Sequence, residues 1–242
     1  MKFKKNVKLA EYTTFKIGGP AEYFYVAKNK NDLIEAVSFA KKIKLPFFIL
    51  GNGSNLLASD KGYKGLVIKT GRPLSLYISK GLEWAAGIPG TIEGAVRGNA
   101  GAFGGEMKDS VKEVEVFDAK SQKIKIFQNK DCQFSYRSSI FKKNPNLIIL
   151  SVKIKSKKSN PQKIKEYLEY RNIHHPKQPS AGSIFKNPEK IRARDLIEKA
   201  GLKGKIIGGA QISEQHANFI INLGGAKAKD VLKLIDFTKK KV

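Results

Sequence analysis

Glycine is concentrated in one stretch of this chain: eight of its 22 glycines lie between residues 81 and 105. Five of them, Gly87, Gly90, Gly94, Gly98 and Gly101, are spaced by three or four residues, which would place them on one face of a helix. Each glycine inside a helix costs about 1 kcal/mol relative to alanine. The stretch therefore indicates a backbone that approaches a flat or anionic ligand, with a glycine-rich loop or tight backbone packing as the alternative.

A second glycine motif, Gly51-Asn52-Gly53-Ser54-Asn55-Leu56-Leu57, follows a short apolar stretch that predicts a buried strand. Its two glycines let the backbone turn sharply and present successive N–H groups, which form a concave site for a pyrophosphate. Leu56 takes the third glycine position of a Rossmann fingerprint, and no Gly-Lys-Ser/Thr of a P-loop follows. A plain Gly-Asn turn is the alternative.

The apolar periodicity predicts an α+β fold, with a break near residues 156–160 that favours a domain boundary near 156. Asn31 or Asp32 is the expected cap of the first long helix, and Pro161 the expected first residue of a later one. Strands are expected at 21–27, 46–50, 65–69, 111–118, 123–127, 147–155 and 217–222, and further helices at 191–200 and 228–240.

Several classes of protein are disfavoured by composition. No apolar run approaches the ~18–20 residues that a bilayer span requires, and the Lys-rich start lacks the apolar region of a signal peptide, so we expect a cytoplasmic protein. One cysteine, Cys132, excludes a disulfide framework and is expected to be a small buried hydrophobe. His174, His175 and His216 lack the spacing of metal ligands; we expect surface or packing roles for them and no metal site.

The formal net charge is +25, with 46 basic and 21 acidic residues. Such a charge fits lysines scattered over solvated faces, a preference for anionic small ligands, or nucleic-acid binding, although no compact basic patch with interleaved aromatics supports the last. Only six of the basic residues are arginines. This scarcity suggests that the chain keeps arginine at positions where a fork-shaped, bidentate donor is needed. Arg137 is one of them, and no acidic residue lies within five positions of it.

Six motifs, in this order along almost the whole chain, carry a resemblance to the UDP-N-acetylenolpyruvoylglucosamine reductases, in their shorter bacterial form. They are Thr14–Ala21, Gly51–Leu57, Gly87–Thr91 with Asn99–Ala102, Ser135–Ser139, Pro179–Pro188 and Gly208–Ser213.

The resemblance implies a fold and a reaction. Residues 1–156, with sub-parts of about 1–70 and 71–156, would form an FAD-binding domain of the vanillyl-alcohol oxidase superfamily type, and residues 157–242 a UDP-sugar domain. NADPH would reduce FAD, and the reduced flavin would deliver hydride to C3 of UDP-N-acetylglucosamine enolpyruvate while a proton reaches C2. The product would be UDP-N-acetylmuramate, a precursor of peptidoglycan. Because FAD, NADPH and the UDP-sugar all carry diphosphates, a positive field would steer them to the protein.

The resemblance also assigns residues. Arg137 would stabilise the enolate, with a structural arginine bonded to backbone carbonyls as the alternative, and Ser183 would donate the proton. The substrate would contact Tyr136, Lys186, Asn187 and, less directly, Gln211. The cofactor would contact Gly51, Asn52, Gly53, Ser54, Asn55, Leu56, Gly87, Ile88, Pro89, Gly90, Thr91, Asn99 and Gly101.

Three departures from the family pattern bear on activity. The family carries a glutamate on a strand after the last helix, and the 242 residues of this sequence hold no counterpart of it. The stretch from Thr70 to Glu83 is shorter than in the family, and Glu93 stands where glycine is usual. The alternative to an active reductase is therefore a catalytically impaired descendant that binds flavin or the UDP-sugar.

Overall fold

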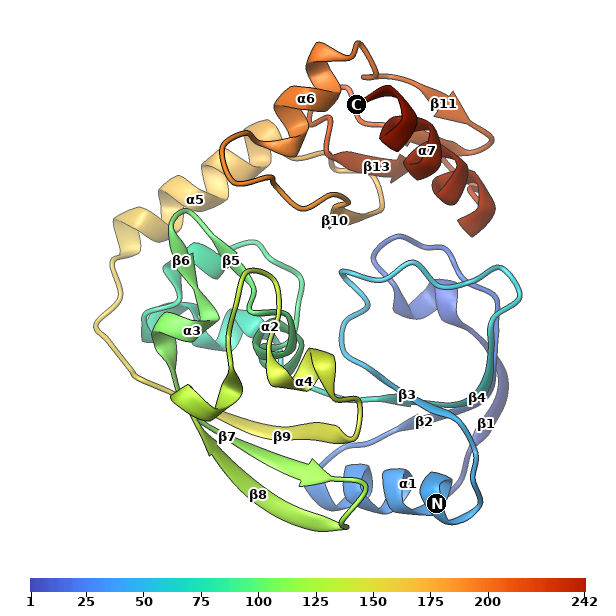
Figure 1. Ribbon diagram of the computed structural model, residues 1–242, viewed down its shortest axis with the longest axis vertical. Helices are drawn as coiled ribbons and strands as arrows, with labels where there is room; N and C mark the ends of the chain where they lie inside the picture. The colour runs from blue at the N-terminus through green and yellow to red at the C-terminus, as the bar shows by residue number, and fades with distance from the viewer. The chain divides into compact units, whose positions relative to one another are not determined.

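The computed structural model describes residues 1–242, which divide into two compact units (Figure 1). The first unit consists of Met1–Lys5, Tyr23–Asn52 and Gly65–Glu169. The second unit consists of Asn6–Glu22, Gly53–Lys64 and Tyr170–Val242. Its helices and separate sheets confirm the predicted α+β class.

The predicted early strands belong to one four-stranded sheet, in the order β1-β2-β4-β3. Strands β3 and β4 are parallel, with Phe47 opposite Leu66. The three predicted strands at 21–27, 46–50 and 65–69 are confirmed to within two residues, and the first strand was not predicted. The bounds are β1 (Lys4–Lys8), β2 (Pro20–Val26), β3 (Phe47–Leu50) and β4 (Tyr63–Lys69).

Helix α1 (Lys30–Lys42) covers part of this sheet with small apolar residues, among which Ala36, Val37 and Ala40 are fully buried. Its cap is Asn29, so the prediction of Asn31 or Asp32 was wrong. Asn29 is extended and its side chain accepts the Asp32 N–H at 2.9 Å, whereas the residues after it already have helical geometry.

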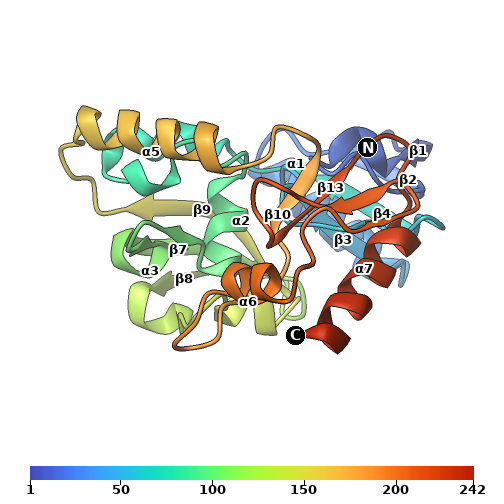
Figure 2. The ribbon, with the colours of Figure 1, turned by 90° about the horizontal axis from the view of Figure 1, so that it is seen from above.

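A three-stranded antiparallel sheet, ordered β8-β7-β9, forms the second layer of the first unit. It comprises β7 (Val111–Asp118), β8 (Lys123–Gln128) and β9 (Leu147–Ile154), as the alternating pattern predicts. Helix α2 (Ile92–Gly98) lies along β9 (Figure 2) and buries Ile92 and Val96 in a cluster with Ile149 and Val152.

Short elements connect these layers. The stretch after β4 forms two 3-10 helices around the buried Trp84, and a two-stranded hairpin follows α2. They are η2 (Leu74–Lys80), η3 (Glu83–Ala85), β5 (Gly101–Ala102), β6 (Gly105–Glu106), α3 (Met107–Ser110), η4 (Asn129–Cys132) and α4 (Ile140–Lys143).

The second unit is built on a four-stranded antiparallel sheet, ordered β10-β13-β12-β11. Its strands are β10 (Ser180–Ser183), β11 (Ile206–Ile207), β12 (Ala210–Ile212) and β13 (Phe219–Asn222). Its core joins the sheet to Phe15 and to the helices, with Ile197, Val231 and Leu234 buried. Its helices are η1 (Leu9–Tyr12), α6 (Ala193–Lys199) and α7 (Ala228–Lys241), whereas α5 (Pro161–His174) begins in the first unit and ends in the second.

The packing of the chain does not follow the predicted boundary near 156. Two early segments, Asn6–Glu22 and Gly53–Lys64, belong to the second unit, and the first unit continues to Glu169. The assignment of residues 1–156 to FAD and of 157–242 to a UDP-sugar is a division by function, and it stays a prediction. No helix has both the length and the apolar character that a membrane span needs.

Candidate functional site

The first half of the early glycine motif lies against the later one. Asn52 Nδ2 donates to the Pro89 carbonyl at 3.0 Å, and Lys69 Nζ donates to the Gly51 carbonyl at 2.9 Å. A Cβ on Gly51 would lie only 2.8 Å from Thr91 Oγ1. The first unit therefore brings together Gly51 and Asn52 with Pro89 and Thr91, two sets of predicted cofactor residues that are about 40 residues apart in sequence.

The second half of that motif belongs to the second unit, where Thr14 holds it. Gly53 has φ +62, and a Cβ there would lie 2.4 Å from the Tyr12 carbonyl oxygen. Thr14 N donates to the Gly53 carbonyl at 3.3 Å, while Thr14 Oγ1 donates to the Ser180 carbonyl at 2.7 Å. Thr14 thus connects the turn that precedes Ser54, Asn55 and Leu56 to β10, a role that no local pattern revealed.

The glycine spacing has two different causes. At Gly101, tight packing accounts for glycine, because a Cβ would lie 2.6 Å from the Gly105 carbonyl oxygen. At Gly98 no protein atom lies within 4 Å of an added Cβ, so packing does not explain the helical glycine there. Gly87 has φ +80, a conformation that favours glycine. Tight packing therefore explains Gly101, whereas the approach of a ligand at Gly98 stays a prediction.

Arg137 lies at the tip of a tight turn in which Ser135 and Ser138 exchange backbone hydrogen bonds at 3.0 Å. Its φ is +54, a left-handed conformation. Its guanidinium donates to the carbonyls of Gly101 at 2.7 Å and Asn99 at 3.4 Å, and it lies 5.2 Å from the ring of the exposed Tyr136. Bonds to backbone carbonyls are what we expected of an arginine with a purely structural role. They leave three of the five guanidinium N–H donors for other partners.

Asn99 is fully buried and holds this turn in place. Its Nδ2 donates to Glu106 Oε2 at 2.7 Å and to the Ser135 carbonyl at 3.0 Å, and its Oδ1 accepts the Lys108 N–H at 3.0 Å. Both amide N–H groups are therefore engaged within the protein. The side chain acts as a positioning group for the Arg137 turn, and a contact between Asn99 and a cofactor would have to use its backbone.

In the second unit, Ser183 ends β10, where it is exposed and pairs with Phe219 of β13. Gly182, with φ +75, precedes it. The buried Asn218 fixes the residues that follow: its Oδ1 accepts the Phe185 N–H at 2.8 Å, and its Nδ2 donates to the Phe185 carbonyl at 2.9 Å. Asn218 is thus a positioning residue for the Ser183 turn that sequence reasoning missed.

The other predicted substrate residues lie on neighbouring segments of the second unit. Lys186 and Asn187 are exposed after the Ser183 turn, and Asn187 Oδ1 accepts the Ala193 N–H at 3.1 Å. Gln211 lies on β12, opposite Ile221, and its Nε2 donates to the Gly204 carbonyl at 3.2 Å. The β10-β13-β12 order therefore places these residues on one sheet and its adjoining loop.

The charged side chains that contact the glycine loops include Lys69 and Glu93. The half-buried Lys69 has a pKa lowered by desolvation. The carboxylate of Glu93 pairs with Arg72 Nε at 3.0 Å, so its negative charge is not left without a partner.

The burial expected of Cys132 and the packing roles expected of two histidines are confirmed. Cys132 is fully buried, and burial raises the pKa of its thiol to about 12. His175 and His216 pack on the ring of Phe219, with ring centroids at 5.0 and 4.7 Å.

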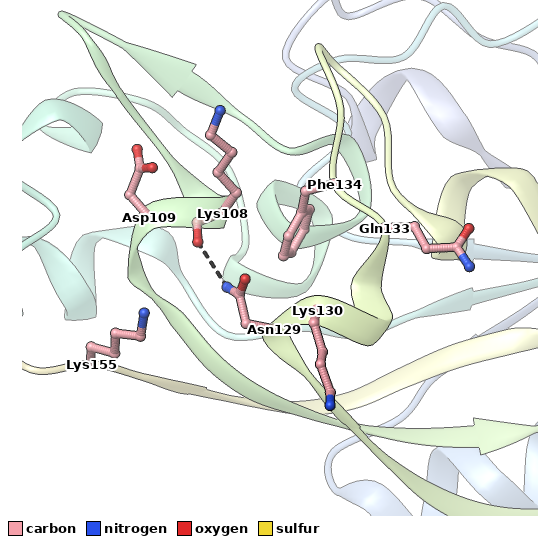
Figure 3. Close-up of a pocket in the computed structure, with 7 residues that line it drawn as sticks. All are labelled: Lys108, Asp109, Asn129, Lys130, Gln133, Phe134 and Lys155. Carbon is pink, nitrogen blue, oxygen red and sulfur yellow. Dashed lines mark hydrogen bonds between the residues drawn. The ribbon is translucent and has the colours of Figure 1, made fainter.

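A hollow of about 580 Å³ in the first unit is lined by Lys108, Asp109, Asn129, Lys130, Gln133, Phe134 and Lys155. Its polar groups do not converge: Figure 3 shows the ammonium groups of Lys108 and Lys130 pointing in opposite directions. Asn129 Nδ2 is engaged by the carbonyls of Lys108 and Val111. None of the predicted site residues lines this hollow.

Known proteins resemble this chain over nearly its full length. A family model described as UDP-N-acetylenolpyruvoylglucosamine reductase, C-terminal domain, matches residues 174–242. The UDP-N-acetylenolpyruvoylglucosamine reductase of Caldanaerobacter subterraneus subsp. tengcongensis is 42% identical over 267 aligned residues, which cover 98% of this chain and 87% of that protein. The same-named protein of Bacillus subtilis (strain 168) is 40% identical over 267 residues, which cover 98% of this chain and 88% of that protein.

The fold agrees with these relatives. The crystal structure of UDP-N-acetylenolpyruvylglucosamine reductase from Thermus caldophilus matches with a TM-score of 0.88 and 35% identity, covering 100% of this chain and 96% of that one. The alignments with the two relatives are longer than the 242 residues of this chain, so the relatives have residues without a counterpart here. Similarity of this extent, in sequence and in fold, shows that the chain belongs to the UDP-N-acetylenolpyruvoylglucosamine reductase family.

Proposed function

We propose that the protein is an FAD-dependent oxidoreductase that uses NADPH to reduce UDP-N-acetylglucosamine enolpyruvate to UDP-N-acetylmuramate, a precursor of peptidoglycan. The observation that carries the proposal is the 42% identity, over 98% of the chain, to a relative named for this reductase activity. The two glycine motifs, joined in the first unit by the bond from Asn52 to Pro89, support it. The cytoplasmic location stays a prediction.

The residues present fit a flavin dinucleotide. Gly53 and Gly87 have positive φ, which turns their backbones sharply within the two motifs. Gly98 has open space where a side chain would stand, although a helix favours alanine there. We therefore assign Gly51–Leu56 to the diphosphate, and Gly87–Thr91 with Gly101 to the flavin part. FAD, when bound, would supply the transfer of a hydride equivalent from NADPH to the substrate.

The chain's own residues act on the charge and the proton. Hydride addition at C3 of the enolpyruvyl group places negative charge on the conjugated carboxylate, which becomes an enolate. Arg137, whose guanidinium is held by the carbonyls of Gly101 and Asn99, is assigned to stabilise that charge with its remaining donors. Ser183 is assigned to donate its hydroxyl proton to C2, because a carbanion-like carbon is basic enough to accept it. One hydride and one proton complete the reduction.

Substrate binding is assigned to four further side chains. Lys186 provides a cation for the anionic UDP-sugar, and Asn187 and Gln211 provide amide groups on the same sheet and loop. Tyr136 offers an exposed ring beside the Arg137 guanidinium. The high net positive charge would raise the local concentration of all three diphosphate ligands.

The first test is flavin binding and turnover. We expect purified protein to show the absorption of bound flavin, and NADPH oxidation to depend on the enolpyruvyl sugar. Protein that is colourless and cannot be reconstituted with FAD would refute the flavin assignment. Bound flavin without sugar-dependent oxidation would instead support the impaired, binding-only descendant.

The second test is Ser183→Ala. Loss of a positioned proton donor lowers a rate by about 10²–10⁴-fold, and we expect a fall of kcat in this range with retained flavin. Ser121→Ala, at an exposed serine in the turn after β7, is the matched control and should leave kcat unchanged. Equal kcat in the Ser183 variant and the control would remove Ser183 from the mechanism.

A further inference from the structure

Glu93 holds the short stretch after β4 through both oxygens of its carboxylate. Its Oε2 accepts the backbone N–H of Arg72 at 2.9 Å, and its Oε1 accepts the side-chain Nε–H of the same residue at 3.0 Å. One carboxylate thus fixes both the backbone and the guanidinium of Arg72. Charge-assisted bonds of this double kind are stronger and more directional than a single surface ion pair.

The stretch that Glu93 holds is paired directly with the glycine loop. The Leu74 N–H donates to the Gly90 carbonyl at 2.9 Å, and the Ile92 N–H donates to the Arg72 carbonyl at 3.0 Å. Pro73 and Thr91 form an antiparallel bridge between these two bonds. A displacement of Arg72 would therefore move Gly90 and Thr91 as well.

The carboxylate of this pair is largely buried, as is that of Asp118 in its pair with Lys125. The Glu93 side chain is only 12% exposed, whereas that of Arg72 is 45% exposed. A Cβ on Gly71 would lie 3.0 Å from Glu93 Oε2 and 2.9 Å from Thr91 Cγ2, so the carboxylate is seated against the backbone of the turn. On its other side, the Arg72 guanidinium lies 5.9 Å from the Tyr77 ring.

We propose that Glu93 and Arg72 form a latch that fixes Gly90 and Thr91 in the conformation that receives the flavin part of the cofactor. Both are positioning residues, since they act through the loop and not on the reacting atoms. The inference rests on the proposed function. The latch also engages the Glu93 carboxylate, so that its charge is compensated beside the proposed cofactor site.

The latch and simple repulsion predict opposite signs for one substitution. If Glu93 only repelled phosphate, Glu93→Gln would tighten FAD binding. If Glu93 is a latch, Glu93→Gln removes the charge, turns an N–H₂ group toward one of the two Arg72 donors, and weakens FAD binding; we expect about a tenfold higher Kd. Glu113→Gln is the matched control, because Glu113 loses the same charge from a more exposed pair, with Lys153 at 3.4 Å.

The test measures FAD Kd on apoprotein by quenching of flavin fluorescence, together with amide hydrogen exchange of the peptide covering residues 70–76. We expect faster exchange and weaker FAD binding in Glu93→Gln and in Arg72→Ala, and neither change in Glu113→Gln. An unchanged or lower Kd in Glu93→Gln, or unchanged exchange, would overturn the latch.

Two further measurements keep the result interpretable. Circular dichroism establishes that each variant is folded. Arg72→Lys keeps the charge and the backbone bond but loses Nε, so its FAD Kd should lie between those of the wild type and Arg72→Ala. Both variants keep the backbone N–H of residue 72, so a loss of FAD affinity in Arg72→Lys equal to that in Arg72→Ala would contradict a contribution of the positive charge to the latch. Wild-type protein that binds no flavin would refute the proposed function, and hydrogen exchange would then still decide whether the latch exists.

Discussion

Asn99→Ala is the most informative single change, because one buried amide connects three segments of the first unit. Its side chain bonds to Glu106, to the Ser135 carbonyl and to the Lys108 N–H, and its φ of +43 is a left-handed conformation. Asparagine tolerates this conformation better than alanine does. The substitution therefore removes hydrogen bonds and strains the backbone.

The expected loss can be estimated bond by bond. The two bonds to neutral backbone groups contribute about 1 kcal/mol each, and the bond to the Glu106 carboxylate about 1.5–3 kcal/mol. The last figure is an upper limit, because the Glu106 side chain is 22% exposed and also pairs with Lys108. Allowing for water at these partly exposed partners, we expect Asn99→Ala to lower the free energy of unfolding by about 3 kcal/mol, including the backbone cost.

Urea unfolding followed by tryptophan fluorescence is the assay. Trp84 is the single tryptophan, belongs to the first unit and is 6% exposed, so its emission reports the unfolding of that unit. Asn99→Gly removes the same bonds but adopts positive φ without strain, and it should recover about 1 kcal/mol relative to alanine. Turnover should fall in both variants, because the Ser135 carbonyl belongs to the turn that carries Arg137.

Two results would refute this reasoning. A loss below about 1 kcal/mol in Asn99→Ala would mean that the three bonds are replaced by water at little cost. Equal stability of the alanine and glycine variants would mean that the left-handed backbone contributes nothing.

The remaining predictions concern a glycine and a histidine. Gly98→Ala should stabilise the apoprotein by about 0.5–1 kcal/mol in the same urea assay, because helices favour alanine and the added Cβ has open space around it. The same substitution should weaken FAD binding. Unchanged FAD affinity would contradict the approach of a ligand to this face of the helix. Burial, aided by the nearby charge of Arg171, lowers the pKa of His175 to about 4 from 6.5. The unfolded chain therefore takes up a proton that the folded protein does not, and stability is lost as the pH falls from about 6.5 to 4. We expect His175→Gln to reduce that loss of stability by on the order of 1 kcal/mol, after discounting for partial exposure. Identical pH profiles of stability in the wild type and the variant would contradict a contribution of His175.

Local pattern predicted the elements well where an apolar period was long. The antiparallel pair at residues 111–118 and 123–127, and the helix that begins at Pro161, are confirmed because each alternation or cap is visible within a few residues. The cap of α1 was misplaced by two residues or more, because Asn29, Asn31 and Asp32 are all capable caps and only the backbone geometry selects Asn29. The packing of Asn6–Glu22 with residues after 170 had no local signal at all.

The candidate site likewise combines features that the sequence predicts with contacts that only the fold determines. The glycine spacing by itself predicted the two loops, because a backbone without side chains is a property of residue type. The scarcity of arginine left six candidates, and only the resemblance to the family selected Arg137 among them. Only the tertiary structure decided which side chains hold the loops and turns of the candidate site. The hydrogen-bonded pairs are Glu93 with Arg72, Asn99 with Ser135, Thr14 with Ser180 and Asn218 with Phe185. All four bonds join residues more than 20 positions apart, and Thr14 and Ser180 are separated by 166. An amide, a hydroxyl or a carboxylate can bond to any backbone that folding brings within 3 Å or so, and its partner is therefore set by the fold and not by its neighbours in sequence.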